Sequence, residues 1–166
     1  MQAPSLVLFA AVSAAAFTLG SVAQAQDLKR GEYLATIMDC TGCHTNGALI
    51  GQPDAALFLA GSTVGFEIPG LAIIYPPNLT PDAETGLGSW TDRQMIDAIR
   101  AGARPDGRQL IPVMPYPSYA ALTDGDAAAL VGYLKSLKPV RHAAPKFTKA
   151  GEPPPAPYLT VVVPKK

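Results

Sequence analysis

The sequence predicts a mainly helical domain, because three segments carry apolar residues at helical spacing whereas a single segment alternates as strands do. The helical segments cover residues 27–39, 91–102 and 123–138, and the strand pattern is a possible short β-hairpin near residues 64–75. The stretches between these segments are long and irregular. Loops of that length are uncommon in a compact domain unless they have a function, such as wrapping a large apolar ligand.

The first helical segment reads DLKRGEYLATIMD. Its apolar face is expected to contain Leu28, Leu34, Ile37 and Met38, which recur at roughly helical spacing. Gly31 lies in the middle of the segment and weakens a helix there. Its presence indicates that another element packs closely against this position.

The hairpin is indicated by two short alternating runs on either side of the turn residues Pro69 and Gly70. The apolar positions of the two runs are Val64, Phe66, Ile68, Leu71, Ile73 and Tyr75.

The second and third helical segments each follow a threonine that can cap a helix. Thr91 and Gln94 have the spacing of a capping box, and Gly102 ends the second segment. Thr123 is the predicted cap of the third segment, which Pro139 stops. The predicted apolar faces contain Met95, Ile96, Ile99, Ala127, Leu130, Val131, Leu134 and Leu137.

The N-terminal residues 1–25 have the pattern of an export signal. An uncharged apolar run over residues 6–23 ends in the small-x-small triplet Ala23-Gln24-Ala25, the kind of site that signal peptidase cuts. We therefore expect the mature chain to begin at Gln26. The run is also just long enough to span a bilayer, so an uncleaved membrane anchor is the alternative.

Charge and proline content set the end of the chain apart. Residues 1–134 hold 6 basic and 12 acidic side chains, whereas residues 135–166 hold 7 basic side chains and 1 acidic one. Proline-rich composition predicts that the tail at 140–166 is extended and weakly ordered, with His142 exposed to solvent. The basic residues lie on a proline-rich tail and do not form the patch typical of nucleic-acid binding. The tail is expected to contact the acidic body, a partner protein or an anionic membrane surface.

The reactive side chains are concentrated in DCTGCH, which contains both cysteines of the sequence. A CxxC pair followed directly by histidine is the attachment signature of c-type haem, in which Cys40 and Cys43 form thioethers with the porphyrin and His44 ligates the iron. A zinc site would need four ligands, and the other histidine, His142, lies far along the sequence. A thioredoxin-like dithiol would need a βαβ surround, which the sequence does not predict. One covalently bound haem c is therefore predicted.

Met114 is the predicted second axial ligand. Met1 lies in the signal, Met38 is too close to the attachment site, and Met95 lies on a helix face where a role in the core is the default. Met114 lies between two prolines in PVMPYP, which restrict the backbone around the thioether. Histidine and methionine together give a closed six-coordinate iron suited to electron transfer. The alternative is that Met114 is an ordinary apolar loop residue.

Other side chains are candidates for contacts around the haem. The carbonyl of Pro53 is a candidate acceptor for the Nδ1–H group of His44. Arg100, Arg104 and Arg108 are candidates for ion pairs with the haem propionates, with a solvated face as the alternative.

These motifs resemble the class I cytochromes c, and more narrowly the haem domains in cytochrome subunits of bacterial membrane-bound alcohol and gluconate dehydrogenases. The resemblance implies an all-α, cytochrome c-like haem domain over residues 26–139, with long haem-wrapping loops. It also implies that the first and last helices cross near Gly31 and Tyr133, and that His44 and Met114 ligate the iron. The matching segments are RGEYLA, CTGCH, PNLTPD, TGLGSW, MPYPSY and LVGYLKSL.

The predicted function is that of a monohaem c-type cytochrome in the periplasm. It would accept single electrons from a dehydrogenase partner and pass them to the respiratory chain, without being an enzyme itself. The alternatives are a peroxidase-like haem enzyme and a gas- or ligand-sensing module, both of which require a displaceable Met114. Membrane contact is expected only through an uncleaved signal or the basic tail. Deletion of residues 140–166 is expected to leave the haem spectrum intact.

Overall fold

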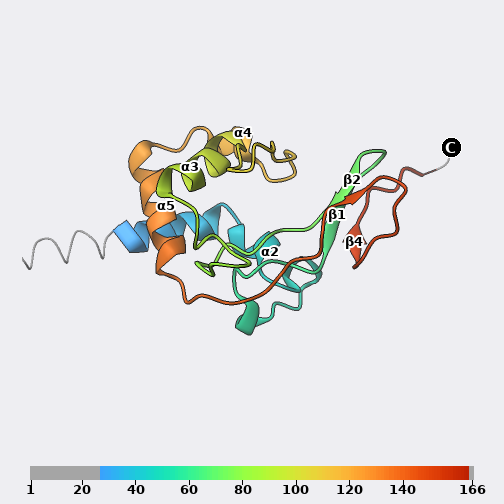
Figure 1. Ribbon diagram of the computed structural model, residues 1–166, viewed down its shortest axis with the longest axis horizontal. Coiled ribbons are helices and arrows are strands. Elements are labelled where there is room, and N and C mark those ends of the chain that lie inside the picture. The colour runs from blue at the N-terminus through green and yellow to red at the C-terminus, as the bar shows by residue number, and fades with distance from the viewer. Residues whose placement is uncertain (1–26, 165–166) are drawn as a thin grey trace, which may run out of the picture.

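The computed structural model describes residues 27–164, and the predicted export signal at 1–25 lies outside that range. Within the described range, no helix has both the length and the apolar character needed to cross a membrane. Figure 1 shows most of the helices toward one end of the molecule and the sheet at the other.

The order of elements along the chain begins with a helix over residues 27–37. The elements that follow are α2 (Cys40–His44), η1 (Ala48–Ile50), η2 (Ala55–Leu57), β1 (Gly65–Ile68), β2 (Ala72–Ile74), α3 (Asp92–Ala101), α4 (Tyr116–Tyr119), α5 (Asp124–Ser136), β3 (Thr148–Lys149) and β4 (Tyr158–Leu159). The three predicted helical segments and the predicted hairpin are therefore present.

The expectation of an all-α fold is wrong, because the structure contains a four-stranded mixed sheet with the order β3-β2-β1-β4. The predicted hairpin forms its centre, with Phe66 opposite Ile74 in the antiparallel pair of β1 and β2. The tail adds the outer strands, β3 antiparallel to β2 and β4 parallel to β1. Strands of two residues in a proline-rich segment show no alternation, so only their tertiary pairing reveals them.

The C-terminal segment is held against the body of the molecule, contrary to the expectation of a weakly ordered tail. After α5, the chain runs from the helices to the sheet (Figure 1). His142, expected to be exposed, is partly buried, and its Nδ1 lies 2.8 Å from the carbonyl oxygen of Ala60. The Tyr75 hydroxyl also donates to the carbonyl oxygen of Ala156 at 2.8 Å.

The hydrophobic core lies between the first helix, α3 and α5. Its buried members are Leu34, Ala35, Leu59, Met95, Ile99, Leu130, Val131 and Leu134. Ile37, predicted on the apolar face of the first helix, is instead 58% exposed. The buried face follows Gly31, Leu34 and Ala35, which lie three and four residues apart and therefore share one side of the helix.

Gly31 lies where the first helix crosses α5, as the resemblance implied. A Cβ atom at this position would lie 2.6 Å from the Cβ of Tyr133, and it would collide with the carbonyl oxygen of Ala129. The two helix backbones can approach this closely because glycine has no side chain.

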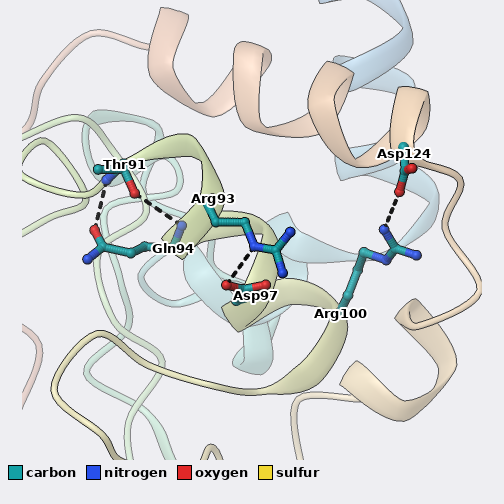
Figure 2. Close-up of polar contacts among 6 residues, drawn as sticks. All are labelled: Thr91, Arg93, Gln94, Asp97, Arg100 and Asp124. Atoms are coloured by element: carbon teal, nitrogen blue, oxygen red, sulfur yellow. Dashed lines mark hydrogen bonds and ion pairs between the residues drawn. The ribbon is translucent and has the colours of Figure 1, made fainter.

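The capping box predicted for α3 is confirmed, and Figure 2 shows its two reciprocal hydrogen bonds. The Gln94 backbone N–H donates to the Thr91 hydroxyl at 3.2 Å, and the Thr91 N–H donates to the Gln94 side-chain oxygen at 2.9 Å. The two bonds satisfy backbone donors that the first turn of a helix otherwise leaves without partners.

Replacing Thr91 with alanine is expected to lower the free energy of unfolding by about 1 kcal/mol, because the cap is lost. Chemical denaturation of the purified protein measures this change. Arg93→Ala is the matched control, since it removes only the exposed pair with Asp97 at 3.0 Å, which is worth about 0.3–0.5 kcal/mol. Equal effects of the two substitutions would contradict a stabilising role for the cap.

Candidate haem-binding site

A cavity of about 990 Å³ lies next to the α2 segment. Its walls come from α2, the hairpin, the loop after the hairpin, α3, the loop before α4, and the segment after α5. The volume is at the upper end of the range of cofactor sites, about 300–1,000 Å³. Most of the residues along its walls are apolar, among them Leu79, Ile99, Leu130 and Leu134.

The short helix α2 places both cysteines on the wall of this cavity. Asp39 precedes the helix in the left-handed region with φ of 54°, and its carboxylate accepts the Gly42 N–H at 3.2 Å. This cap turns the chain sharply out of the first helix. Because Cys40 and Cys43 are three residues apart on a helix, they share one face.

Burial of the thiols suits attachment of a cofactor better than dithiol redox chemistry. Burial raises the pKa of Cys40 to about 11, and burial also raises the pKa of Cys43. A redox-active CxxC pair has the opposite property, a thiol whose pKa is lowered so that the thiolate is available at neutral pH.

His44 lines the cavity with its ring held by the loop after the hairpin. Its Nδ1 lies 2.8 Å from the carbonyl oxygen of Pro77, so Pro77 rather than the expected Pro53 is the partner. Burial lowers the pKa of His44, although the hydrogen bond opposes this shift. A neutral ring that donates from Nδ1 keeps the lone pair of Nε2 available for a metal.

The position of Pro77 depends on contacts between segments that are distant in the sequence. Thr45 forms a parallel bridge with Gly61. Ser62 N–H donates to the Pro76 carbonyl at 3.0 Å, and Leu79 N–H donates to the Leu59 carbonyl at 2.9 Å. These contacts bring the loop after the hairpin alongside α2, which sequence spacing alone does not reveal.

Three methionines of the described chain line the cavity, namely Met38, Met95 and Met114. Met95 is 2% exposed on α3 and belongs to the core. The carbonyl of Met38 accepts the Tyr119 hydroxyl at 2.8 Å, just before the attachment segment. Met114 lies in the loop before α4 and packs at the edge of the core. Met114 therefore shares the cavity with His44, and its role as ligand stays a prediction.

Of the three arginines considered for the propionates, two line the cavity. Arg104 lies over the ring of Trp90, 5.1 Å from its centroid, and Arg108 pairs with Asp106 at 2.7 Å. The hydrogen bond from Arg108 contributes most to lowering the pKa of Asp106 to about 2. Arg100 instead pairs with Asp124 at 2.6 Å (Figure 2).

Sequence reasoning missed one wall of the cavity. Ala143, Ala144, Pro145 and Phe147, all in the proline-rich tail, line it. No local pattern marks these residues, because their position depends on the pairing of β3 with β2. Pro77 was also missed, although the matched segment PNLTPD contains it.

The residues of the cavity fit a covalently bound haem. The walls are apolar, two thiols lie on one of them, and a neutral imidazole is oriented by a backbone carbonyl. A methionine thioether on the wall suits the iron. The two arginine guanidinium groups suit the carboxylates of a porphyrin.

Curated relatives match most of this chain and about a quarter of their own length. One is the cytochrome c subunit of a quinone-dependent alcohol dehydrogenase from Gluconobacter oxydans, 41% identical over 80% of this chain and 27% of the relative. A fructose dehydrogenase cytochrome subunit from Gluconobacter japonicus is 44% identical over 72% of this chain and 23% of the relative. A gluconate 2-dehydrogenase cytochrome c subunit from Pantoea cypripedii is 40% identical over 72% and 26%.

The sequence model of the cytochrome c family matches residues 28–138 of this chain. The match contains Cys40, Cys43 and His44, as well as α3, α5 and the hairpin. Membership of this family implies covalently bound haem c. The chain belongs to the cytochrome c family.

Proposed function

We propose that this chain is a monohaem c-type cytochrome that carries single electrons. One haem c would be attached through Cys40 and Cys43, and His44 and Met114 would be the ligands of its iron. The observation that carries the proposal is the CxxCH segment on the wall of a cavity of about 990 Å³, with His44 oriented by the Pro77 carbonyl.

The residues around the cavity have separate tasks in this proposal. The haem, when bound, supplies a one-electron couple. The Pro77 carbonyl keeps the proton of His44 on Nδ1, so that Nε2 would be available to the iron as a neutral donor. The apolar walls exclude water, and Arg104 and Arg108 supply positive charge for carboxylates. In this proposal the chain is an electron carrier and not itself an enzyme.

A dehydrogenase is the proposed electron donor, and a component of the respiratory chain is the proposed acceptor. The relatives support the donor, because they are cytochrome subunits of alcohol, fructose and gluconate dehydrogenases. In this proposal residues 1–25 direct export to the periplasm, residues 26–139 form the haem domain, and residues 140–166 are the proline-rich basic tail.

Replacing Met114 with alanine is expected to open the sixth coordination position of the iron. The parent protein, produced with haem c maturation, should show a low-spin spectrum with the weak red methionine-to-iron band and no carbon monoxide binding. The variant should lose that band and bind carbon monoxide stoichiometrically when reduced. Absorption spectra before and after adding carbon monoxide measure both properties.

Met95→Leu and Met38→Leu are the controls, because both methionines line the same cavity. Each should keep the methionine band and stay indifferent to carbon monoxide. Loss of the band in one of these controls, with Met114→Ala unchanged, would assign the ligand to that methionine instead. A parent protein that is high-spin or binds carbon monoxide readily would contradict electron transfer and favour a peroxidase-like enzyme or a ligand sensor.

A further inference from the structure

We propose that the C-terminal strap, residues 140–149, is a structural part of the haem site. The strap closes one wall of the cavity, and it is pinned to the loop whose Pro77 carbonyl holds His44. This inference rests on the proposed haem site, and it assigns a role to a segment outside the residues 28–138 matched by the family.

The hydrogen bonds that hold the strap to this loop, called the pin below, centre on Asn78, which is 1% exposed. Its side-chain nitrogen donates to the Val140 carbonyl at 2.7 Å, and its side-chain oxygen accepts the Thr80 hydroxyl at 2.8 Å. The Thr80 hydroxyl in turn accepts the Val140 N–H at 3.1 Å. Both backbone groups of Val140 are therefore bonded to side chains of the PNLTPD segment.

A second threonine of the loop, Thr85, binds the strap in a similar way at His142, two residues after Val140. The Thr85 hydroxyl accepts the His142 N–H at 3.0 Å and the Asn78 side-chain N–H at 3.0 Å, and it donates to Asp82 at 2.7 Å. These hydrogen bonds use both acceptor positions and the one donor of the hydroxyl. The strap is thus tied to a satisfied polar network, which is costly to break where the groups are buried.

The pinned loop is the one that orients His44. Asn78 follows Pro77 directly in the sequence, so the side chain that holds Val140 is one residue from the carbonyl that holds the His44 ring. The His142 ring adds a third tie, to the Ala60 carbonyl at 2.8 Å. Ala60 precedes Gly61, which pairs with Thr45 next to His44.

Beyond the pin, the strap forms a wall of the cavity. Ala143, Ala144, Pro145 and Phe147 line the cavity, as do Phe66 and Ile74 of the hairpin. The strap ends in β3, where the buried Thr148 pairs with Ile73 of β2. Figure 1 shows this segment running between the helices and the sheet. The strap is therefore held at both ends, with its apolar middle on the cavity.

Excluding water at this wall favours the reduced state of the iron, because the oxidised state carries one more positive charge and gains more from hydration. Release of the strap should therefore lower the midpoint potential. The expectation from the sequence concerned only the haem spectrum, which deletion of residues 140–166 should leave intact, and the midpoint potential is a separate property.

Thr80→Val in the full-length, haem-loaded protein tests the proposal, since valine has nearly the shape of threonine but cannot bond to Val140. Two properties are measured, the hydrogen exchange of the Val140 amide and the midpoint potential. We expect the amide to exchange at least tenfold faster. At the midpoint potential of the parent, the ratio of reduced to oxidised protein should fall about threefold to tenfold, a tenfold fall being about 59 mV for one electron.

Thr80→Ser keeps the hydroxyl, so this variant should have the same Val140 amide exchange and the same midpoint potential as the parent. Thr36→Val, which removes an exposed hydroxyl bonded to Glu32 within the first helix, should change neither. The proposal is overturned if Thr80→Val frees the amide while the midpoint stays or rises, or if the amide stays protected. Failure of the proposed function is seen separately, as a parent protein without a low-spin haem spectrum.

Phe147→Ala tests the wall without disturbing the pin. Phe147 is 51% exposed, so the substitution should leave the fold intact. We expect the midpoint potential to fall while the Val140 amide stays protected, because water then reaches the cavity past an intact strap. If Thr80→Val does not fold, this variant decides the question, and an unchanged midpoint would rule out the strap as a wall of the site.

Discussion

Replacing both Cys40 and Cys43 with serine is expected to abolish covalent haem attachment, from one haem per chain to essentially none. The two thiols share one face of α2 and line the cavity, and the sequence contains no other cysteine. Serine preserves the shape of the helix but cannot form a thioether. Acidified organic solvent, which extracts haem that is not covalently bound, measures the difference.

Thr41→Ser in the same helix is the matched control and should keep the haem attached after denaturation. Each single cysteine variant retains one thiol and so tests whether one bond suffices to retain the cofactor. Haem that stays with the denatured double variant would show that the attachment does not depend on these thiols and would overturn the proposed site.

Replacing Gly31 with alanine is expected to destabilise the protein by about 1–3 kcal/mol or more, the usual cost of adding volume to a tightly packed contact. The new methyl group would collide with the Ala129 carbonyl oxygen and lie 2.6 Å from the Cβ of Tyr133. Both obstacles lie on or next to the backbone of α5. Relief therefore requires the two helices to separate, which loosens the core that they share with α3. Chemical denaturation measures the change in the free energy of unfolding.

Gly132→Ala, in α5, is the matched control for the same pair of helices. The nearest neighbour of a Cβ at this position is a terminal atom of Leu28 at 4.0 Å, an ordinary contact. Alanine should therefore stabilise this variant by about 0.5–1 kcal/mol, because it restricts the unfolded chain and favours a helix. If Gly31→Ala were as stable as Gly132→Ala, the close crossing at Gly31 would not exist in solution.

Local features of the sequence determined the helices, the hairpin and the chemistry of attachment. The cap at Thr91, the stop at Gly102 and the turn at Gly70 depend on backbone preferences of a few neighbouring residues, and the structure has all three. Cys43 and His44 are consecutive residues, so the sequence alone places them next to each other. Such short-range patterns are readable because the groups that interact are only a few positions apart.

Only the tertiary structure decided how the site is enclosed. The choice of Pro77 over Pro53 as the partner of His44 depends on where the loop after the hairpin lies, 33 residues from the histidine along the chain. The role of the tail depends on Asn78 reaching Val140 across 62 residues. Two-residue strands and backbone carbonyls show no side-chain periodicity, so no local pattern predicts them. The packing of distant segments therefore determines the mixed sheet and the position of the strap.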